Sequence, residues 1–98
     1  MRMHFHAVNF DADQKLLAII QKKLDRLEKF NDRIIEADVY LKVNNTGKAN
    51  KTVEVKVYLP GGSVVVSRDA ETFEKATDLV YDVLKRQLKR TKAKREGM

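Results

Sequence analysis

Two segments in the middle of the chain, residues 35–43 and 53–59, alternate strictly between apolar and polar side chains. Alternation with a period of two is typical of a β-strand that turns one face to a core and the other to solvent. We therefore expect a sheet with one apolar face, which other elements must cover. The apolar positions are Ile35, Ala37, Val39, Leu41, Val43, Val53, Val55, Val57 and Leu59.

Turn signals connect these segments to each other and to a further strand. A polar loop over residues 44–50 separates the two alternating segments. Leu59-Pro60-Gly61-Gly62-Ser63 predicts a hairpin, because glycine readily adopts the positive φ that such turns require. A phosphate cradle is the alternative for these glycines, but no helix N-terminus or Lys-Ser/Thr pair follows them, so the hairpin is favoured. Val64 to Val66 then forms the fourth strand.

The opening residues predict a first strand. Met3, Phe5 and Ala7 occupy one face, and His4 and His6 share the other. A metal site would need at least one further ligand, and only scattered acids are available nearby. We therefore expect two partly exposed histidines and no metal site.

Two other stretches have helical spacing. Asp11, followed by Gln14, resembles an N-cap with its capping-box partner and predicts a first helix over about residues 12–30. Asp69 resembles the N-cap of a second helix, with Glu71 in its first turn. The inward positions are Leu16, Ile20, Leu24 and Leu27 in the first helix and Phe73, Ala76, Val80, Val83, Leu84 and Gln87 in the second.

The expected fold is α+β, with the order β-α-β-β-β-α. Strands two to four are predicted as antiparallel neighbours in a four-stranded sheet, and both helices pack on one face, as in a double-stranded RNA-binding domain. A chain of 98 residues is long enough for one domain and too short for two. We place a single domain over residues 1–95 and a frayed basic tail over residues 92–98.

The excess positive charge is concentrated near the C-terminus. The net charge is +6, from 20 basic and 14 acidic residues. Without the seven cations of residues 84–95, 13 basic residues would face 14 acidic ones. A polyanionic partner is one interpretation, and a solvated helix end that complements the helix dipole is the other. The seven cations are Lys85, Arg86, Lys89, Arg90, Lys92, Lys94 and Arg95.

The first helix is predicted to be polarised from side to side. A helical wheel places its basic residues within a band about 60° wide, and its acids and glutamines on the opposite flank. Chance can produce such sorting in a solvated helix, but it also suits one basic surface shared with the second helix. The basic residues are Lys15, Lys22, Arg26, Lys29 and Arg33, and the opposite flank holds Gln14, Gln21, Asp25 and Glu28.

Several classes of function are disfavoured. The absence of cysteine excludes disulfides, thiol nucleophiles and cysteine-based zinc sites. We find no catalytic triad and no phosphate-binding loop, and Glu36 and Asp38 suit solvated strand positions better than paired catalytic carboxylates. No signal peptide or apolar run of about 20 residues occurs. We expect a soluble cytoplasmic protein that is not an enzyme and holds no cofactor.

Three groups of residues resemble a known family. Lys23-Leu24-Asp25-Arg26-Leu27-Glu28-Lys29 precedes Asp32-Arg33-Ile34, the turn contains Pro60-Gly61-Gly62, and the second helix contains Ala76-Thr77-Asp78-Leu79, Arg86-Gln87-Leu88 and Arg90. In this order they resemble the short-form ribosome hibernation promoting factors, a group that includes the ribosome-associated translation inhibitors. Thr72-Phe73-Glu74 departs from the Asp-Met-Tyr that many members carry before the second helix's alanine.

The resemblance implies a role on the ribosome. It predicts binding to small-subunit rRNA at the decoding centre, over the messenger and tRNA positions, which would keep ribosomes inactive in stationary phase or stress. It further implies a monomer without the C-terminal dimerisation domain of the long form, with a separate ribosome modulation factor as a possible additional partner. Together with the wheel, it nominates Lys22, Lys23, Arg26, Lys29, Lys85, Arg86, Lys89, Arg90, Lys92 and Lys94 as rRNA-binding residues.

Two other functions remain open at this stage. One is a stand-alone module that binds structured RNA or DNA away from the ribosome. The other is a basic domain for membrane surfaces or protein scaffolding. Beyond Leu84 and Leu88 the basic segment lacks the bulky apolar residues of a membrane-surface helix, so we expect no membrane partner.

Overall fold

The computed structural model describes residues 1–44 and 47–96, and the side chains of residues 1–44 and 47–91. The order β-α-β-β-β-α is confirmed, with one short 3₁₀ helix added after the first α-helix. The elements are β1 (Arg2–Val8), α1 (Gln14–Asp25), η1 (Arg26–Lys29), β2 (Glu36–Val43), β3 (Lys51–Leu59), β4 (Gly62–Ala70) and α2 (Phe73–Glu96).

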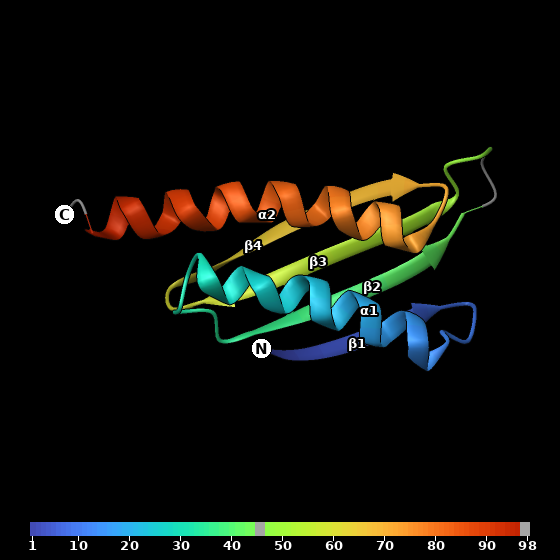
Figure 1. Ribbon diagram of the computed structural model, residues 1–98, viewed down its shortest axis with the longest axis horizontal. Helices are drawn as coiled ribbons and strands as arrows, with labels where there is room; N and C mark the ends of the chain where they lie inside the picture. Colours follow the sequence, from blue (N-terminus) through green and yellow to red (C-terminus); the bar gives the residue numbers. More distant parts are fainter. Residues whose placement is uncertain (45–46, 97–98) are drawn as a thin grey trace.

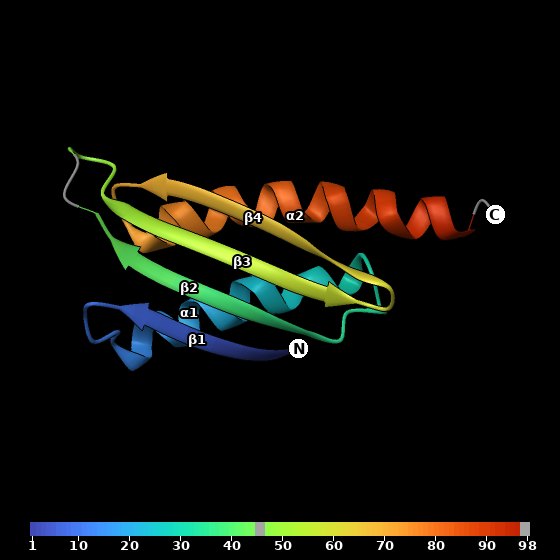
Figure 2. The ribbon, with the colours of Figure 1, turned by 180° about the vertical axis from the view of Figure 1, so that it is seen from behind.

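The four strands form one sheet in the order β1-β2-β3-β4. β2, β3 and β4 are antiparallel neighbours as predicted, whereas β1 pairs with β2 in parallel. A parallel pair needs a crossover connection, and α1 provides it. Both helices lie on one face of the sheet (Figure 1), and the view from behind shows the other face uncovered (Figure 2).

The core lies between the helices and the inner face of the sheet. The predicted alternation is confirmed for the central positions of β2 and β3, which are fully buried. The two flanking positions are not buried: Ile35 is 59% exposed and Val43 is 43% exposed, because Ile35 directly precedes β2 and Val43 ends it. The fully buried side chains include Ala37, Val39, Leu41, Val53, Val55 and Val57 from the sheet and Ile20, Leu24, Leu27, Val80, Leu84 and Leu88 from the helices.

The first helix begins and ends differently from the prediction. Its N-cap is Asp13, not Asp11: the backbone N–H of Lys15 donates to Asp13 Oδ1 at 3.1 Å. The α-helix ends at Asp25 and tightens into η1, which runs to Lys29. The α-helical prediction over residues 12–30 was therefore too long at both ends, although the chain stays helical as far as Lys29.

The second helix begins later than predicted, and the fourth strand is longer. Asp69 lies in β4, where it accepts a hydrogen bond from Thr52 Oγ1 at 2.5 Å. The cap is Thr72, whose Oγ1 accepts from the backbone N–H of Lys75 at 3.1 Å. Pairing of Ala70 with Lys51 extends the strand well past Val66, so Asp69 cannot cap a helix.

The last turns of α2 extend the helix past Arg90. The backbone is helical as far as Glu96, whereas residues 97 and 98 lie outside the described part of the chain. Fraying of residues 92–98 stays a prediction. The predicted RNA contacts of Lys92 and Lys94 fall on side chains that the structure does not describe.

Candidate nucleic-acid interface

The two helices lie next to each other on the sheet, and Lys23 bridges them. Its Nζ lies 3.1 Å from Asp78 Oδ1 and 4.8 Å from the centroid of the Tyr81 ring. The Lys23 side chain is 31% exposed, and the ring beneath it is buried. This position agrees with the wheel, whose basic band includes Lys22 but not Lys23. Lys23 thus holds α1 against α2, and its charge is partly matched by Asp78.

A second contact between the two basic segments is made by Phe30, directly after η1. The Nζ atoms of Lys85 and Lys89 lie 5.1 and 4.8 Å from the centroid of this ring. A ring face attracts cations, so Phe30 gathers two lysines of α2 beside the end of η1. Sequence reasoning treated Phe30 only as the end of a helix. The signal available was an aromatic residue directly after Lys29 in a basic segment.

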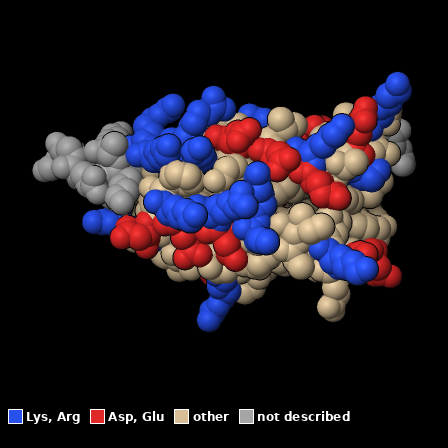
Figure 3. Space-filling view, viewed as in Figure 1, with Lys and Arg blue, Asp and Glu red and all other residues tan. Residues whose placement is uncertain are grey.

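Five other residues predicted to bind rRNA have side chains that the structure describes, and all five are exposed on the same side of the molecule. Figure 3 shows basic side chains gathered over the end of α1 and the C-terminal half of α2, while acidic side chains gather over the first half of α2. Within residues 1–44 and 47–91, none of these five cations has an ion-pair partner. Their charge is therefore available to a ligand. They are Lys22, Arg26, Lys29, Arg86 and Arg90, called the basic surface below together with Lys85 and Lys89.

The acids of the first helix are turned away from this basic surface and are matched by the N-terminus. The Met1 ammonium lies 3.3 Å from Asp25 Oδ1 and also pairs with Glu28. Gln21 Nε2 donates to Met1 O at 3.1 Å and to Asp25 Oδ1 at 3.0 Å. The hydrogen bond to Glu28 is the main reason that the pKa of the Met1 amino group is raised. The predicted sorting is confirmed for Asp25 and Glu28 against Arg26 and Lys29, whereas Arg33, which the wheel placed in the same basic band, lies in the loop after η1 because the helix ends at Lys29.

The uncovered face of the sheet carries charge of both signs. His4 Nε2 lies 3.0 Å from Glu36 Oε2, and His6 stacks on Tyr40 with a centroid separation of 4.7 Å. The Tyr58 hydroxyl donates to Asp38 Oδ2 at 2.8 Å, and this bond is the main reason that the pKa of Tyr58 is raised. Across the described residues, no cluster of three or more His, Asp or Glu side chains could hold a metal ion.

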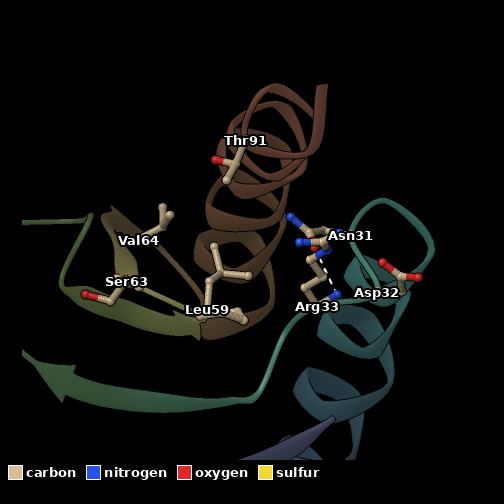
Figure 4. A pocket seen from close by; sticks show the side chains of 10 residues that line it. Asn31, Asp32, Arg33, Leu59, Ser63, Val64 and Thr91 are labelled. Atoms are coloured by element: carbon tan, nitrogen blue, oxygen red, sulfur yellow. Dashed lines mark hydrogen bonds between the residues drawn. The ribbon is translucent and has the colours of Figure 1, made fainter. Parts of the chain in front are cut away.

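A buried asparagine fixes the loop after η1 against α2. Asn31 is 2% exposed, its Nδ2 donates to the Leu88 carbonyl at 3.3 Å, and its Oδ1 accepts from the Arg33 backbone N–H at 3.0 Å. These two bonds tie the backbone of the loop at Arg33, through Asn31, to α2. A hollow of about 390 Å³ opens here, bounded by the loop, the β3–β4 turn and Thr91 (Figure 4). No sequence signal indicated this hollow.

Comparison with known proteins places the chain in a family. Residues 3–96 match the family described as Sigma 54 modulation protein / S30EA ribosomal protein. The chain belongs to this family. The S30EA match spans β1 to α2 and therefore includes both helices of the basic surface.

Individual relatives agree with this assignment. The chain is 32% identical over 98 residues to the ribosome hibernation promoting factor of Pseudomonas putida, covering 100% of this chain and 93% of that protein. It is 29% identical over 94 residues to the Escherichia coli K12 protein of the same name, covering 96% of each. The predicted membership of the hibernation promoting factor group is thereby confirmed.

Solved structures show the same fold. A ribosomal subunit interface protein from Coxiella burnetii superposes with a TM-score of 0.84 at 27% identity, over 95% of this chain and 99% of that one. The N-terminal domain of Thermus thermophilus Protein Y gives a TM-score of 0.80 at 30% identity, over 93% and 99% of the two chains. In the part of the chain that the structure describes, no helix is long and apolar enough to cross a membrane.

Proposed function

We propose that this protein is a ribosome hibernation factor that binds small-subunit rRNA at the decoding centre. The observation that carries the proposal is the basic surface, where two neighbouring helices present cations that the described acids do not neutralise. The names of the relatives in Pseudomonas putida and Escherichia coli support the hibernation role. The similar protein from Coxiella burnetii is named for the ribosomal subunit interface, which supports a ribosomal partner.

The chemistry of the basic surface suits the backbone of structured RNA. Double-stranded RNA presents phosphates and 2′-hydroxyls across its minor groove and is recognised mainly by shape. Exposed lysines and arginines neutralise phosphates and release their counterions, which supplies affinity without sequence specificity. Arg26 of η1 and Arg86 and Arg90 of α2 are the side chains we assign to these phosphate contacts.

Occupation of the decoding centre would inhibit translation by exclusion. Messenger and tRNA cannot enter positions that a folded domain fills, so the ribosome stays idle until the protein leaves. No bond is made or broken in this scheme, and the protein acts in the cytoplasm as a monomer and a binding partner, not as an enzyme. Its use in stationary phase or stress belongs to the same proposal.

Co-sedimentation with purified ribosomal subunits tests the proposal. We expect the protein to pellet with small subunits at low salt and much less with large subunits. tRNA bound together with messenger should displace it from small subunits. Failure to pellet with small subunits at low salt would overturn the proposal.

The same experiment separates the stand-alone RNA module. The basic surface reads the phosphate backbone by position, so it would also fit structured RNA away from the ribosome. Such a module would pellet with both subunits alike and would resist competition by tRNA and messenger.

A further inference from the structure

The hollow beside the basic surface is lined in part by Gly62, a strand position that lacks a side chain. Side chains alternate between the two faces of a strand, so Gly62 lies on the same face of β4 as Val64 and the buried Val66. A Cβ built on Gly62 would meet no atom within 4 Å. The turn before Gly62 has Gly61 at φ 86°, a conformation that favours glycine.

The walls of the hollow offer both apolar and polar groups. Leu59 and Val64 lie on the hairpin side, while Arg33 and Thr91 face them from the loop and from α2 (Figure 4). Pro60 also lines the hollow. Thr91 Oγ1 donates to the Gln87 carbonyl at 2.9 Å, so among the described side chains its methyl group and the Arg33 guanidinium are the surfaces offered on that side. A volume of about 390 Å³ lies within the usual range of about 300–1,000 Å³ for small-molecule sites.

The charge of the lining favours an uncharged ring over a phosphate group. Among the lining residues whose side chains the structure describes, Arg33 is the one cation and Asp32 the one acid, and Figure 4 shows the Asp32 carboxylate pointing away from the others. A phosphate is better held by the several cations of the basic surface next to it. Arg90, which directly precedes Thr91, and Lys29 on η1 are exposed beside the same loop and helix.

We infer that the hollow takes one unstacked nucleobase of the RNA that the basic surface binds. Single-stranded bases in protein–RNA complexes insert between apolar side chains and stack on arginine planes, while flanking phosphates contact cations. Here the Leu59 and Val64 side chains pack against the ring and the Arg33 guanidinium stacks on it or donates to its edge. This inference rests on the proposed function, because it assigns a subsite to the same RNA.

A side chain at Gly62 tests the inference directly. Gly62→Val fills the hollow at a position where a Cβ meets nothing, and valine suits a strand, so we expect the fold to be retained. Val65→Phe is the matched control: it adds bulk on the opposite, solvent face of the same strand, where Val65 is 52% exposed. Arg33→Gln is the second variant and removes the guanidinium from an exposed side chain.

Two RNA probes of equal length separate base insertion from backbone binding. One is a hairpin with an unpaired loop, and the other is a fully paired duplex. We expect Gly62→Val to weaken hairpin binding about tenfold, the range for loss of one stacked base, and to leave duplex binding unchanged. The slope of log affinity against log salt should not change for Gly62→Val, because no phosphate contact is lost. Val65→Phe should match the wild type on both probes.

Either of two results would overturn the base subsite. One is hairpin binding by Gly62→Val equal to that of the wild type. The other is equal weakening on the hairpin and the duplex while the melting temperature stays unchanged. Neither result would overturn the proposed function if the wild-type protein still binds small subunits and if its affinity for RNA still falls steeply with salt concentration. If Gly62→Val has no melting transition and is therefore unfolded, Arg33→Gln is tested in its place. A preference of Arg33→Gln for the hairpin over the duplex equal to that of the wild type would overturn the base subsite.

Discussion

The two faces of this molecule carry similar types of side chain and arrange them differently. On the uncovered sheet face, acids and bases oppose each other: the strand register pairs Asp38 with Lys56, and Glu36 lies beside His4. On the helix face, acids lie early in α2, on the flank of α1 and η1 that meets the N-terminus, and at Asp32 in the loop after η1. The basic surface occupies the other flank of α1 and η1 and the C-terminal half of α2 (Figure 3).

If the proposed function holds, the number of cations on a face does not by itself make it a polyanion site. A cation next to a carboxylate contributes little to the potential at a phosphate some distance away, because the two charges screen each other. Arg86 and Arg90 stand on a helix segment without a described acid partner, whereas Lys56 stands across from Asp38. Under the proposed function, the distribution of acids thus selects the face that binds RNA.

Charge reversal on the two faces gives the largest expected difference. Arg86→Glu with Arg90→Glu should weaken binding to small subunits by about 100-fold or more, because two phosphate contacts are lost and two repulsions are gained. Lys42→Glu with Lys56→Glu makes the same change in net charge on the sheet face and should weaken it by less than about threefold. Filter binding at low salt measures both. Equal losses would mean that affinity follows net charge alone.

Smaller differences in stability and salt dependence are expected between two cations of the helix face. Lys23 holds the two helices together, whereas Arg26 does not. Lys23→Met removes the contacts with Asp78 and Tyr81 and should lower the free energy of unfolding by about 0.5–1 kcal/mol. Arg26→Met should leave stability unchanged and make the slope of log affinity against log salt shallower by about 0.7–0.9.

Urea denaturation and salt titrations of the two variants distinguish these roles. If Lys23→Met flattens the salt dependence as much as Arg26→Met does, Lys23 contacts phosphate directly, as the family resemblance implies. A stability loss with an unchanged slope would assign Lys23 to positioning the two helices.

The smallest expected effect concerns the N-terminal ammonium, which forms ion pairs with Asp25 and Glu28. Its pKa is raised in the folded protein, so its stabilising contribution is complete below the unfolded value of about 8 and is lost as pH rises through the folded pKa. N-terminal acetylation should lower the melting temperature by about 2 °C or less at pH 7. The difference between acetylated and free protein should then shrink towards pH 10. Melting curves that stay parallel across this range would contradict the assignment.

Sequence periodicity was sufficient to predict which face of a strand or helix a residue occupies, because side chains return to the same face at a fixed spacing. The alternation in residues 53–59 identified the buried face of β3, and the wheel separated Arg26 from Asp25 on the first helix. Both inferences need only the geometry of an ideal strand or helix. The motifs and their order along the chain also indicated the family, and the match to the S30EA family confirms that inference.

Helix starts were harder because several residues carry the same capping signal. Asp11 and Asp13 are both suitable N-caps, as are Asp69 and Thr72. The N-cap of the second helix depends on strand pairing far away in the sequence, because the pairing of Ala70 with Lys51 keeps Asp69 in the sheet. A local signal cannot decide between two caps when a neighbouring strand determines where the helix can begin.

The sequence by itself determined the order of elements, the apolar face of the sheet and the excess of positive charge at one end of the chain. Only the tertiary structure decided which charges remain available. It placed Lys23 against Asp78 and Tyr81, gathered Lys85 and Lys89 on Phe30, and opened a hollow over Gly62. The physical reason is that periodicity is encoded in neighbouring residues, whereas the partner of each charge is set by packing between segments far apart in the chain.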